Sequence, residues 1–342
     1  MNTKATKKEG KQSTSLSQIA EAAGVSKMTV SRVLRDADGF SEATRLKVMR
    51  EVERHEYVPN RLAAAFGPSN SSTLIGVCVP RLSSHFFGQV LESMDRTFQR
   101  LGLQTMIGSH NELLDDEERW LKNILSWRPA GVLLSSKQHN KGTLKLLSDA
   151  QIPVMEFWNL NTSPLDMSVG FNEFDSGFEM SRYAILQGYK NAGLLGAIQD
   201  RDSGRRERFD GFIKGFVDGG GKIIKDESLN DLPGFYAGYY GTENLLNQTS
   251  DLDMIYYQDD TMAMGGLSWC RRKGIRVPQD IGIAGWGGHE AASILEQRLT
   301  TTAIPMQQIG KLAAELLARK LRQEPSTDVT AVPARLVKGD TL

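Results

Sequence analysis

Short apolar runs alternate with longer amphipathic stretches over most of the chain, and the spacing of the apolar positions separates strands from helices. The strand-like runs are Leu74–Val79, Leu103–Ile107, Gly131–Leu134, Pro153–Phe157, Ala192–Ala197, Met254–Tyr257 and Ile281–Gly285. The helical stretches between them include Phe87–Leu101, Asp115–Trp127, Glu173–Leu186, Arg206–Val217, Thr261–Lys273 and Met306–Arg322. Repeated strand–helix units predict α/β structure with parallel sheets, right-handed crossovers and helices on both faces. Because residues 73–342 are many for one doubly wound sheet, we expect two.

The first 58 residues show a different pattern, typical of a small all-α domain. Ser15 and Gln18 form a capping box before a helix over residues 16–23, and Gly24 ends that helix. Ser26 caps a second helix over residues 27–34, so two short helices flank a tight turn with a glycine, which is a helix-turn-helix. The apolar seam between these helices is expected to contain Ala20, Val25, Val30 and Val33. A third helix runs from its cap Ser41 to His55, with the stripe Leu46, Val48, Met49 and Val52 expected to be buried.

The domain boundaries follow from changes in composition. Residues 1–14 are polar and basic and are expected to be a disordered tail, and residues 15–58 form the helix-turn-helix domain. Residues 59–72 combine a short potential helix with a Gly-, Pro- and Ser-rich linker. The α/β core then spans residues 73–342.

Composition narrows the functional classes. The only two cysteines, Cys78 and Cys270, lie in apolar stretches far apart, which indicates reduced buried thiols in a cytoplasmic protein. The sequence holds no apolar run long enough for a membrane span, and its polar, basic N-terminus leads us to expect no secretory signal. The five histidines have no metal-ligand spacing, and no nucleotide-binding loop or nucleophile elbow occurs, so we expect no metal, no cofactor and no enzymatic activity.

The net charge of zero conceals an uneven distribution. Residues 1–66 contain 12 Lys and Arg against 8 Asp and Glu, a net charge of +4, so the remainder carries −4. This distribution is compatible with a nucleic-acid partner that binds the basic N-terminal domain and not the acidic core.

The N-terminal motifs identify the family. Ile19-Ala, Ala23-Gly-Val-Ser, Thr29-Val-Ser-Arg-Val and Tyr57-Val-Pro-Asn-Arg resemble, in content and spacing, the DNA-binding headpiece of the LacI-type (lactose repressor-like) transcription regulators. The resemblance implies that Lys27, Met28 and Arg32 of the second helix face base edges in the major groove. Ser15, Ser26, Thr29 and Ser31 are small donors suited to phosphates, although helix capping would equally explain them.

The segment after the headpiece resembles the family's hinge helix, which contacts the minor groove. Asn60, Arg61 and Ala63 belong to the DNA-binding set on this basis, and Phe66 stands where the family has an intercalating leucine. Phenylalanine also serves as a wedge between base steps, and burial against the core is the alternative role for Phe66.

The resemblance extends through the core to about Glu324. It rests on segments Val79–Phe87, Arg208–Phe212, Asp259–Gly265 and Val277–Gly285. It implies two subdomains of the periplasmic-binding-protein type joined by three crossovers near Phe171, Thr301 and Thr330. The N-subdomain would comprise residues 73–171 and 302–330, and the C-subdomain residues 172–301 and 331–342.

The effector is indicated by charge. Gly287 replaces an Asp that grips hydroxyls in sugar-binding members, and a buried carboxylate there would repel an anion. Arg208 aligns with the family's effector-binding arginine and suits a carboxylate, with Arg201, Arg205 and Arg206 nearby. The expected effector-binding set is completed by Ser84, Phe86, Phe87, Trp158, Asp259, Trp286 and His289. The aromatic members could equally be packing residues.

Further segments, including Ile124–Trp127, Ile152–Val154 and Val169–Phe171, are similar to the gluconate-operon-repressor subgroup. The sequence therefore predicts a cytoplasmic, homodimeric repressor that a sugar acid, gluconate or 2-ketogluconate, releases from a pseudo-palindromic operator. A neutral sugar, a phosphorylated effector and corepression are the alternatives within the family. A solute-binding protein or an enzyme on the same scaffold fits the sequence less well, because the headpiece is present and no convergent nucleophile and base are apparent.

Overall fold

In the computed structural model, the described part of the N-terminal unit contains the helices α1 (Leu16–Ala23), α2 (Lys27–Leu34) and α3 (Glu42–Arg54). The structure describes residues 14–34, 39–58, 72–196, 203–229, 232 and 234–342, and the chain divides into Met1–Ser72 and Thr73–Leu342. The capping box of Ser15 and Gln18 and the left-handed Gly24 after α1 confirm the predicted ends of this helix. The predicted hinge residues Asn60, Arg61, Ala63 and Phe66 lie outside the described residues, as does Arg201.

A small apolar core holds the three helices together. Ala20 of α1 packs with Val30 and Val33 of α2 and Val48 of α3, all buried. The predicted stripe on α3 is partly wrong, because the side chains of Leu46 and Met49 are 59% and 43% exposed. A unit as small as this one can enclose only a narrow seam, so α3 buries one row of side chains instead of a broad face.

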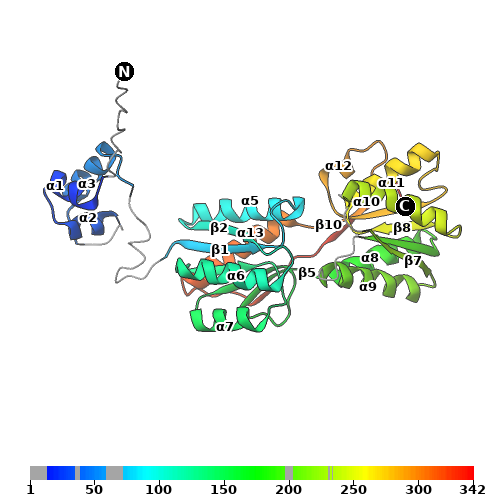
Figure 1. Cartoon of the computed structure of the whole chain (residues 1–342), viewed down its shortest axis with the longest axis horizontal. Coiled ribbons are helices and arrows are strands. Elements are labelled where there is room, and N and C mark those ends of the chain that lie inside the picture. Colours follow the sequence, from blue (N-terminus) through cyan, green and yellow to red (C-terminus); the bar gives the residue numbers. More distant parts are fainter. Residues whose placement is uncertain (1–13, 35–38, 59–71, 197–202, 230–231, 233) are drawn as a thin grey trace, which may run out of the picture. The chain divides into compact units, whose positions relative to one another are not determined.

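The core unit contains two six-stranded sheets (Figure 1). In spatial order the first sheet consists of β11 (Val329–Ala331), β5 (Met167–Phe171), β4 (Val154–Asn159), β3 (Gly131–Leu134), β1 (Leu74–Val79) and β2 (Gln104–Ser109). The second sheet consists of β12 (Arg335–Val337), β10 (Thr300–Ala303), β9 (Gly282–Gly287), β8 (Met254–Tyr257), β6 (Asn191–Gly196) and β7 (Lys222–Ser228). All neighbouring strands are parallel except β10 and β12. The predicted pair of doubly wound sheets is therefore confirmed.

Helices cover both faces of each sheet (Figure 1). Those of the first sheet are α5 (His85–Arg100) and α13 (Met306–Leu321) on one face, and α6 (Leu114–Ser126) and α7 (Lys141–Ala150) on the other. Those of the second sheet are α8 (Glu173–Leu186) and α9 (Ser203–Asp218) on one face, and α10 (Gly234–Gln248) and α11 (Asp260–Lys273) on the other. The short α12 (Glu290–Ser293) follows β9. We call the part around the first sheet the first lobe and the part around the second sheet the second lobe.

Alternation along the strands explains this layering. In β1, Val77 and Val79 pack toward α5 and α13, whereas Cys78 between them packs toward α6. The chain passes between the lobes after β5, after β10 and between β11 and β12. The boundary expected at residue 302 lies inside β10, so this passage begins after Ala303.

Candidate functional site

Helix α2 presents a polar face and an apolar face. Val30 and Val33 are buried, whereas Lys27, Met28 and Arg32 are exposed, Met28 to 71%. The three side chains expected to face base edges therefore lie on the solvent side of one helix.

The small hydroxyl residues of the headpiece have structural roles. The Ser15 hydroxyl accepts the Gln18 N–H, and the Ser26 hydroxyl accepts the Thr29 N–H over 3.1 Å. The Ser26 and Thr29 hydroxyls are also hydrogen bonded to each other at 2.9 Å. Helix capping explains Ser15 and Ser26 without DNA, and Ser31 and Thr29 are half-buried.

A cavity of about 1020 Å³ lies between the two lobes and takes its walls from both. Eight of the residues expected to bind the effector line it: Ser84, Phe86, Phe87, Trp158, Arg205, Arg208, Asp259 and Trp286. The cavity is large enough for a small metabolite, since typical ligand pockets measure about 300–1,000 Å³. Its position at the carboxyl ends of β1, β4 and β9 is the usual ligand site of open α/β sheets.

Arg208 is the best-anchored charge in this wall. Its side chain is 3% exposed, and its Nη1 donates to Glu173 over 2.5 Å. Its Nη2 donates to the Gln258 carbonyl over 3.0 Å. The guanidinium thus already has a carboxylate partner, and a ligand carboxylate would have to share it with Glu173.

Close packing of α8 on α9 holds the Arg208–Glu173 pair together. Gly177 faces the backbone of α9 so closely that a Cβ there would lie 1.9 Å from the Arg208 carbonyl oxygen. A side chain at Gly177 would force the two helices apart and lengthen the ion pair.

The first two turns of α9 give the second lobe a cationic wall. Gly204, Arg205, Arg206 and Arg208 all line the cavity. The N-terminal turn of a helix has unsatisfied backbone N–H groups and a positive dipole end, which favour an anion.

The acid Asp259 lies on the same side of the cavity. It caps α11, accepting the Met262 N–H over 2.9 Å, and burial raises its pKa above the ordinary value. This cap gives Asp259 a structural role besides any contact with a ligand.

Aromatic rings form the apolar wall. Phe87 lies 4.8 Å from Trp158 between ring centroids, Trp158 lies 5.3 Å from Phe171, and Phe86 lies 5.4 Å from Trp286. Trp158 has a φ of +94°, a strained conformation for a residue other than glycine. The tight packing of the surrounding rings maintains this conformation.

Phe86 gives the missing Asp a second explanation. Gly287 has a φ of +119°, and a Cβ there would lie 2.4 Å from Cε1 of Phe86. The ring of Phe86 thus occupies the space that a side chain at this position would need, so the left-handed backbone and this packing together account for the glycine.

His289 is the one expected effector residue that is absent from the cavity lining. Its ring stacks on that of His85 with 4.2 Å between centroids, and its backbone N–H donates to Asp260 over 2.6 Å. His289 therefore faces α5, and its contacts with His85 and Asp260 give it a structural role.

The first lobe contributes residues that the sequence reading missed. These are Arg81, His110, Glu112, Asp115, Asp116, Arg119, Ser135, Ser136, Lys137, Gln138 and Asn159. Arg81 and Glu112 form an ion pair at 2.9 Å, and Arg119 and Asp116 one at 2.7 Å. The signal available was positional: these residues follow β1, β2, β3 or end β4, where the carboxyl ends of parallel strands meet.

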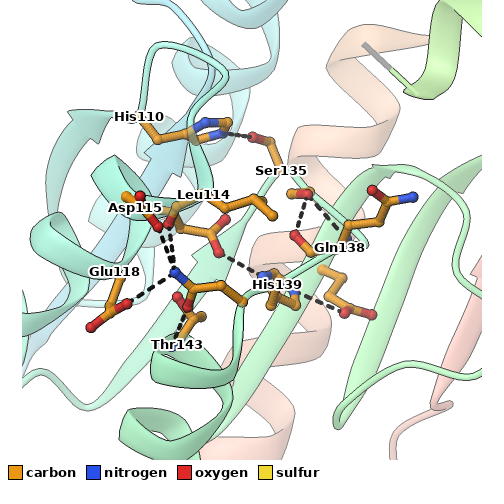
Figure 2. A network of polar contacts seen from close by, with 12 residues as sticks. His110, Leu114, Asp115, Glu118, Ser135, Gln138, His139 and Thr143 are labelled. Atoms are coloured by element: carbon orange, nitrogen blue, oxygen red, sulfur yellow. Dashed lines mark hydrogen bonds and ion pairs between the residues drawn. The ribbon is translucent and has the colours of Figure 1, made fainter. Parts of the chain in front are cut away.

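A buried polar network stands behind this wall (Figure 2). His139, whose side chain is 3% exposed, contacts Glu117 through Nδ1 at 2.6 Å and Glu156 through Nε2 at 3.2 Å. Burial lowers the pKa of His139, but the hydrogen bonds to the two carboxylates outweigh it and raise the pKa to about 9. The imidazolium at neutral pH therefore ties the loop after β3 to α6 and β4.

The described part of the chain contains neither a candidate membrane-spanning helix nor a candidate metal-binding cluster. None of its helices is long and apolar enough to cross a membrane. None of its groups of His, Cys, Asp and Glu side chains is arranged to hold a metal ion. Cys78 and Cys270 are free and buried, and burial raises the pKa of Cys270 to about 12.

A helix-turn-helix unit joined to a two-lobed α/β core with a ligand-sized cavity defines a ligand-responsive, DNA-binding transcription regulator. Residues 15–60 match the model of bacterial regulatory proteins of the lacI family, and residues 182–342 match the periplasmic binding protein-like domain. The chain is 30% identical to the HTH-type transcriptional regulator GntR of Escherichia coli strain K12 over 327 residues, 96% of each chain. The chain belongs to the LacI family, whose members are transcriptional regulators and not enzymes.

Other relatives agree with this assignment. The HTH-type transcriptional regulator IdnR of Escherichia coli strain K12 is 29% identical over 96% of this chain and 98% of its own. The crystal structure of a LacI family transcriptional regulator from Silicibacter pomeroyi has a TM-score of 0.89 at 33% identity, covering 96% of this chain and 99% of that one. The lac repressor dimer bound to operator, 23% identical with a TM-score of 0.84 over 96% and 99% of the two chains, shares the fold. Regulators of this family bind operator DNA and small-molecule effectors and function as dimers.

Proposed function

We propose that this regulator represses genes of sugar-acid metabolism and leaves a pseudo-palindromic operator when gluconate or 2-ketogluconate enters the cavity. The cationic first two turns of α9 carry this proposal. Three arginines and the N-terminal end of a helix face one cavity, an arrangement suited to a carboxylate. The polar groups of the first lobe, such as Ser135 and Asp116, would then accept or donate hydrogen bonds to the hydroxyl groups of the ligand.

DNA binding is assigned to α2. Lys27, Met28 and Arg32 would contact bases. Hydroxyl groups would donate hydrogen bonds to phosphates where helix capping does not already engage them, from Ser15, Ser26, Thr29 and Ser31. The hinge residues Asn60, Arg61, Ala63 and Phe66 remain part of the proposed minor-groove contact. A regulator of operator DNA acts where the chromosome lies, so we place it in the cytoplasm.

A neutral sugar is the second candidate effector. Asp115 and Asp116 line the cavity, and carboxylates commonly accept hydrogen bonds from sugar hydroxyls. A phosphorylated effector would have to compete with Glu112 and Asp116 for Arg81 and Arg119.

Fluorescence polarisation of labelled operator DNA tests the proposal. Gluconate and 2-ketogluconate should raise the operator Kd, whereas glucose should not, and gluconate 6-phosphate reports on the phosphorylated alternative. Arg206→Gln should weaken the response to gluconate, while Arg182→Gln on the surface of α8 should leave it unchanged. The sugar-acid proposal fails when no sugar acid at millimolar concentration alters operator affinity, and tighter operator binding would mean corepression.

A further inference from the structure

A polar bridge joins the two lobes next to the cavity. Lys137, in the loop after β3 of the first lobe, donates from Nζ to both oxygens of Glu207 on α9 of the second lobe, over 2.7 and 2.8 Å. Asn159, at the end of β4 of the first lobe, donates from Nδ2 to Glu207 Oε2 over 3.1 Å. One carboxylate of the second lobe thus receives two donors from the first.

The bridge is part of the cavity. Lys137 and Asn159 line it, and the neighbours of Glu207 in sequence, Arg206 and Arg208, line it as well. The side chains of Lys137 and Glu207 are 23% and 34% exposed, so solvent screens this pair less than it screens an ion pair on the open surface.

Both ends of the bridge rest on rigid supports. His139, two residues after Lys137, is fixed between Glu117 and Glu156, and Asn140 is hydrogen bonded to Asp115 and Glu118 (Figure 2). These contacts anchor the loop that carries Lys137 to α6, α7 and β4.

At the other end, the α9 turn that carries Glu207 is held against α8 by the Arg208–Glu173 ion pair. Each end of the bridge is fixed to its own lobe. A movement of one lobe therefore acts on the other lobe through the bridge.

We propose that Lys137, Glu207 and Asn159 act as positioning residues that hold the cationic first two turns of α9 at a fixed distance from the first lobe. The effector could then contact the cavity lining of both lobes at once. None of its binding free energy would be needed to bring the two lobes together. Lys137 has a second effect, because its positive charge neutralises Glu207. Without it, the negative charge of Glu207 would weaken the attraction of the flanking arginines for an anionic effector. This inference rests on the proposed function for the identity of the effector, but the bridge itself can be tested without one.

Amide hydrogen exchange of the full-length protein without effector tests the coupling directly. Glu207→Gln, a change on the second lobe, should speed exchange in residues 135–140 of the first lobe. Lys137→Met should in turn speed exchange in the second turn of α9, residues 207–210, whose amides donate within the helix. Lys214→Met is the matched control, since Lys214 pairs with Asp218 within α9 and reaches no residue of the first lobe in that pair. Changes confined to the mutated lobe would overturn the proposal.

Effector affinity provides the second readout. Lys137→Met and Glu207→Gln should each weaken gluconate binding about three- to ten-fold, and the double variant should bind no worse than the weaker single variant. Reversing the charges, with Lys137→Glu and Glu207→Lys together, should restore part of the affinity that either reversal alone removes. Losses that simply add, or no rescue, would show that the two side chains act separately.

The two proposals fail in distinguishable ways. If no sugar acid binds the wild-type protein but exchange is coupled between the lobes, the effector proposal is wrong and the bridge is supported. If gluconate binds the wild type and both bridge variants equally, the effector proposal is supported and the bridge has no positioning role.

Discussion

The guanidinium carbon of Arg208 lies 3.8 Å from the centroid of the Trp286 ring. Stacking on an indole suits a planar, weakly hydrated cation, and the Glu173 carboxylate and the Gln258 carbonyl bind its N–H groups. The arginine therefore has one orientation before any ligand arrives. Arg208, which we propose binds the effector, is thus held in place by its own lobe.

Arg208→Lys should show how far effector binding depends on the planar guanidinium and how far on the positive charge alone. Lysine keeps the positive charge but loses the planar fork and the stacking on Trp286, so gluconate affinity should fall about ten-fold or more. The free energy of unfolding should fall by about 1–3 kcal/mol, because Glu173 loses part of its buried partner. Calorimetric titration and urea denaturation measure the two effects. Arg206→Lys, at an exposed position of the same turn, should change stability far less, and equal gluconate affinity in wild type and Arg208→Lys would contradict this role.

Gly287→Asp tests why this chain lacks the family's aspartate. If Phe86 excludes a side chain, the variant should lose about 1–3 kcal/mol of unfolding free energy from the strained φ alone, with the clash adding to it. Phe86→Ala combined with Gly287→Asp should recover the part caused by the clash but not the part caused by φ. Urea denaturation of Gly287→Asp, of Phe86→Ala alone and of the double variant checks this. A stable single variant that loses only anion binding would instead support charge repulsion as the reason for the glycine.

The elements that the sequence predicted well are those with strong local signals. Caps and apolar seams defined α1 and α2, because Ser15, Gln18, Gly24 and Ser26 act within one turn of the chain. The buried central strands β1, β3 and β8 were equally clear as short apolar runs. The strands that were missed include β7, with a half-exposed, charged sequence at a sheet edge, and the three-residue β11 and β12. Their pairing depends on neighbours far away in the sequence.

The sequence predicted only those site residues whose type and position in the chain indicate a role by themselves. The arginines of α9 were identified, but the partnership of Arg208 with Glu173, 35 positions away, depends on the packing of α8 on α9. Lys137 and Asn159 escaped notice because a lone lysine or asparagine after a strand resembles any solvated residue. The ring that fills the space beside Gly287 comes from Phe86 of the other lobe, which no local pattern could indicate.

Arg32→Ala should reveal how α2 reads the operator. Arg32 is exposed on α2, one turn after Lys27 and Met28, and a bidentate contact with guanine contributes roughly 1–3 kcal/mol. The variant should bind the operator more weakly by that amount and lose discrimination at one base pair per half-site. Fluorescence polarisation on operators with single substitutions measures both effects. Arg50→Ala on α3 removes the same charge outside the recognition helix, and its effect should not depend on the base sequence. Equal losses for Arg32→Ala on operator and random DNA would place Arg32 on the backbone.

The buried Glu117–His139–Glu156 network should make stability depend on alkaline pH. The pKa of His139 is about 9 in the folded protein against an ordinary value of 6.5, so the folded state keeps a proton that the unfolded state releases. The contribution of this proton is therefore fully present below pH 6.5 and is lost as pH rises through about 9. A difference of this size corresponds to at most about 3 kcal/mol, and urea denaturation from pH 6 to pH 10 should show a decline of that order.

His139→Gln provides the control for this decline. Glutamine can still donate one hydrogen bond to Glu117 or Glu156 but does not titrate, so the variant should be less stable than wild type at pH 6.5 and should lose little more by pH 9.5. The two stability curves should converge as pH rises, because the wild-type protein then loses the charge that the variant never has. Parallel curves would mean that His139 is neutral in the folded protein and that the loop after β3 is held without an imidazolium. In that case the support at this end of the Lys137–Glu207 bridge would come from Asn140 and its contacts with α6 instead.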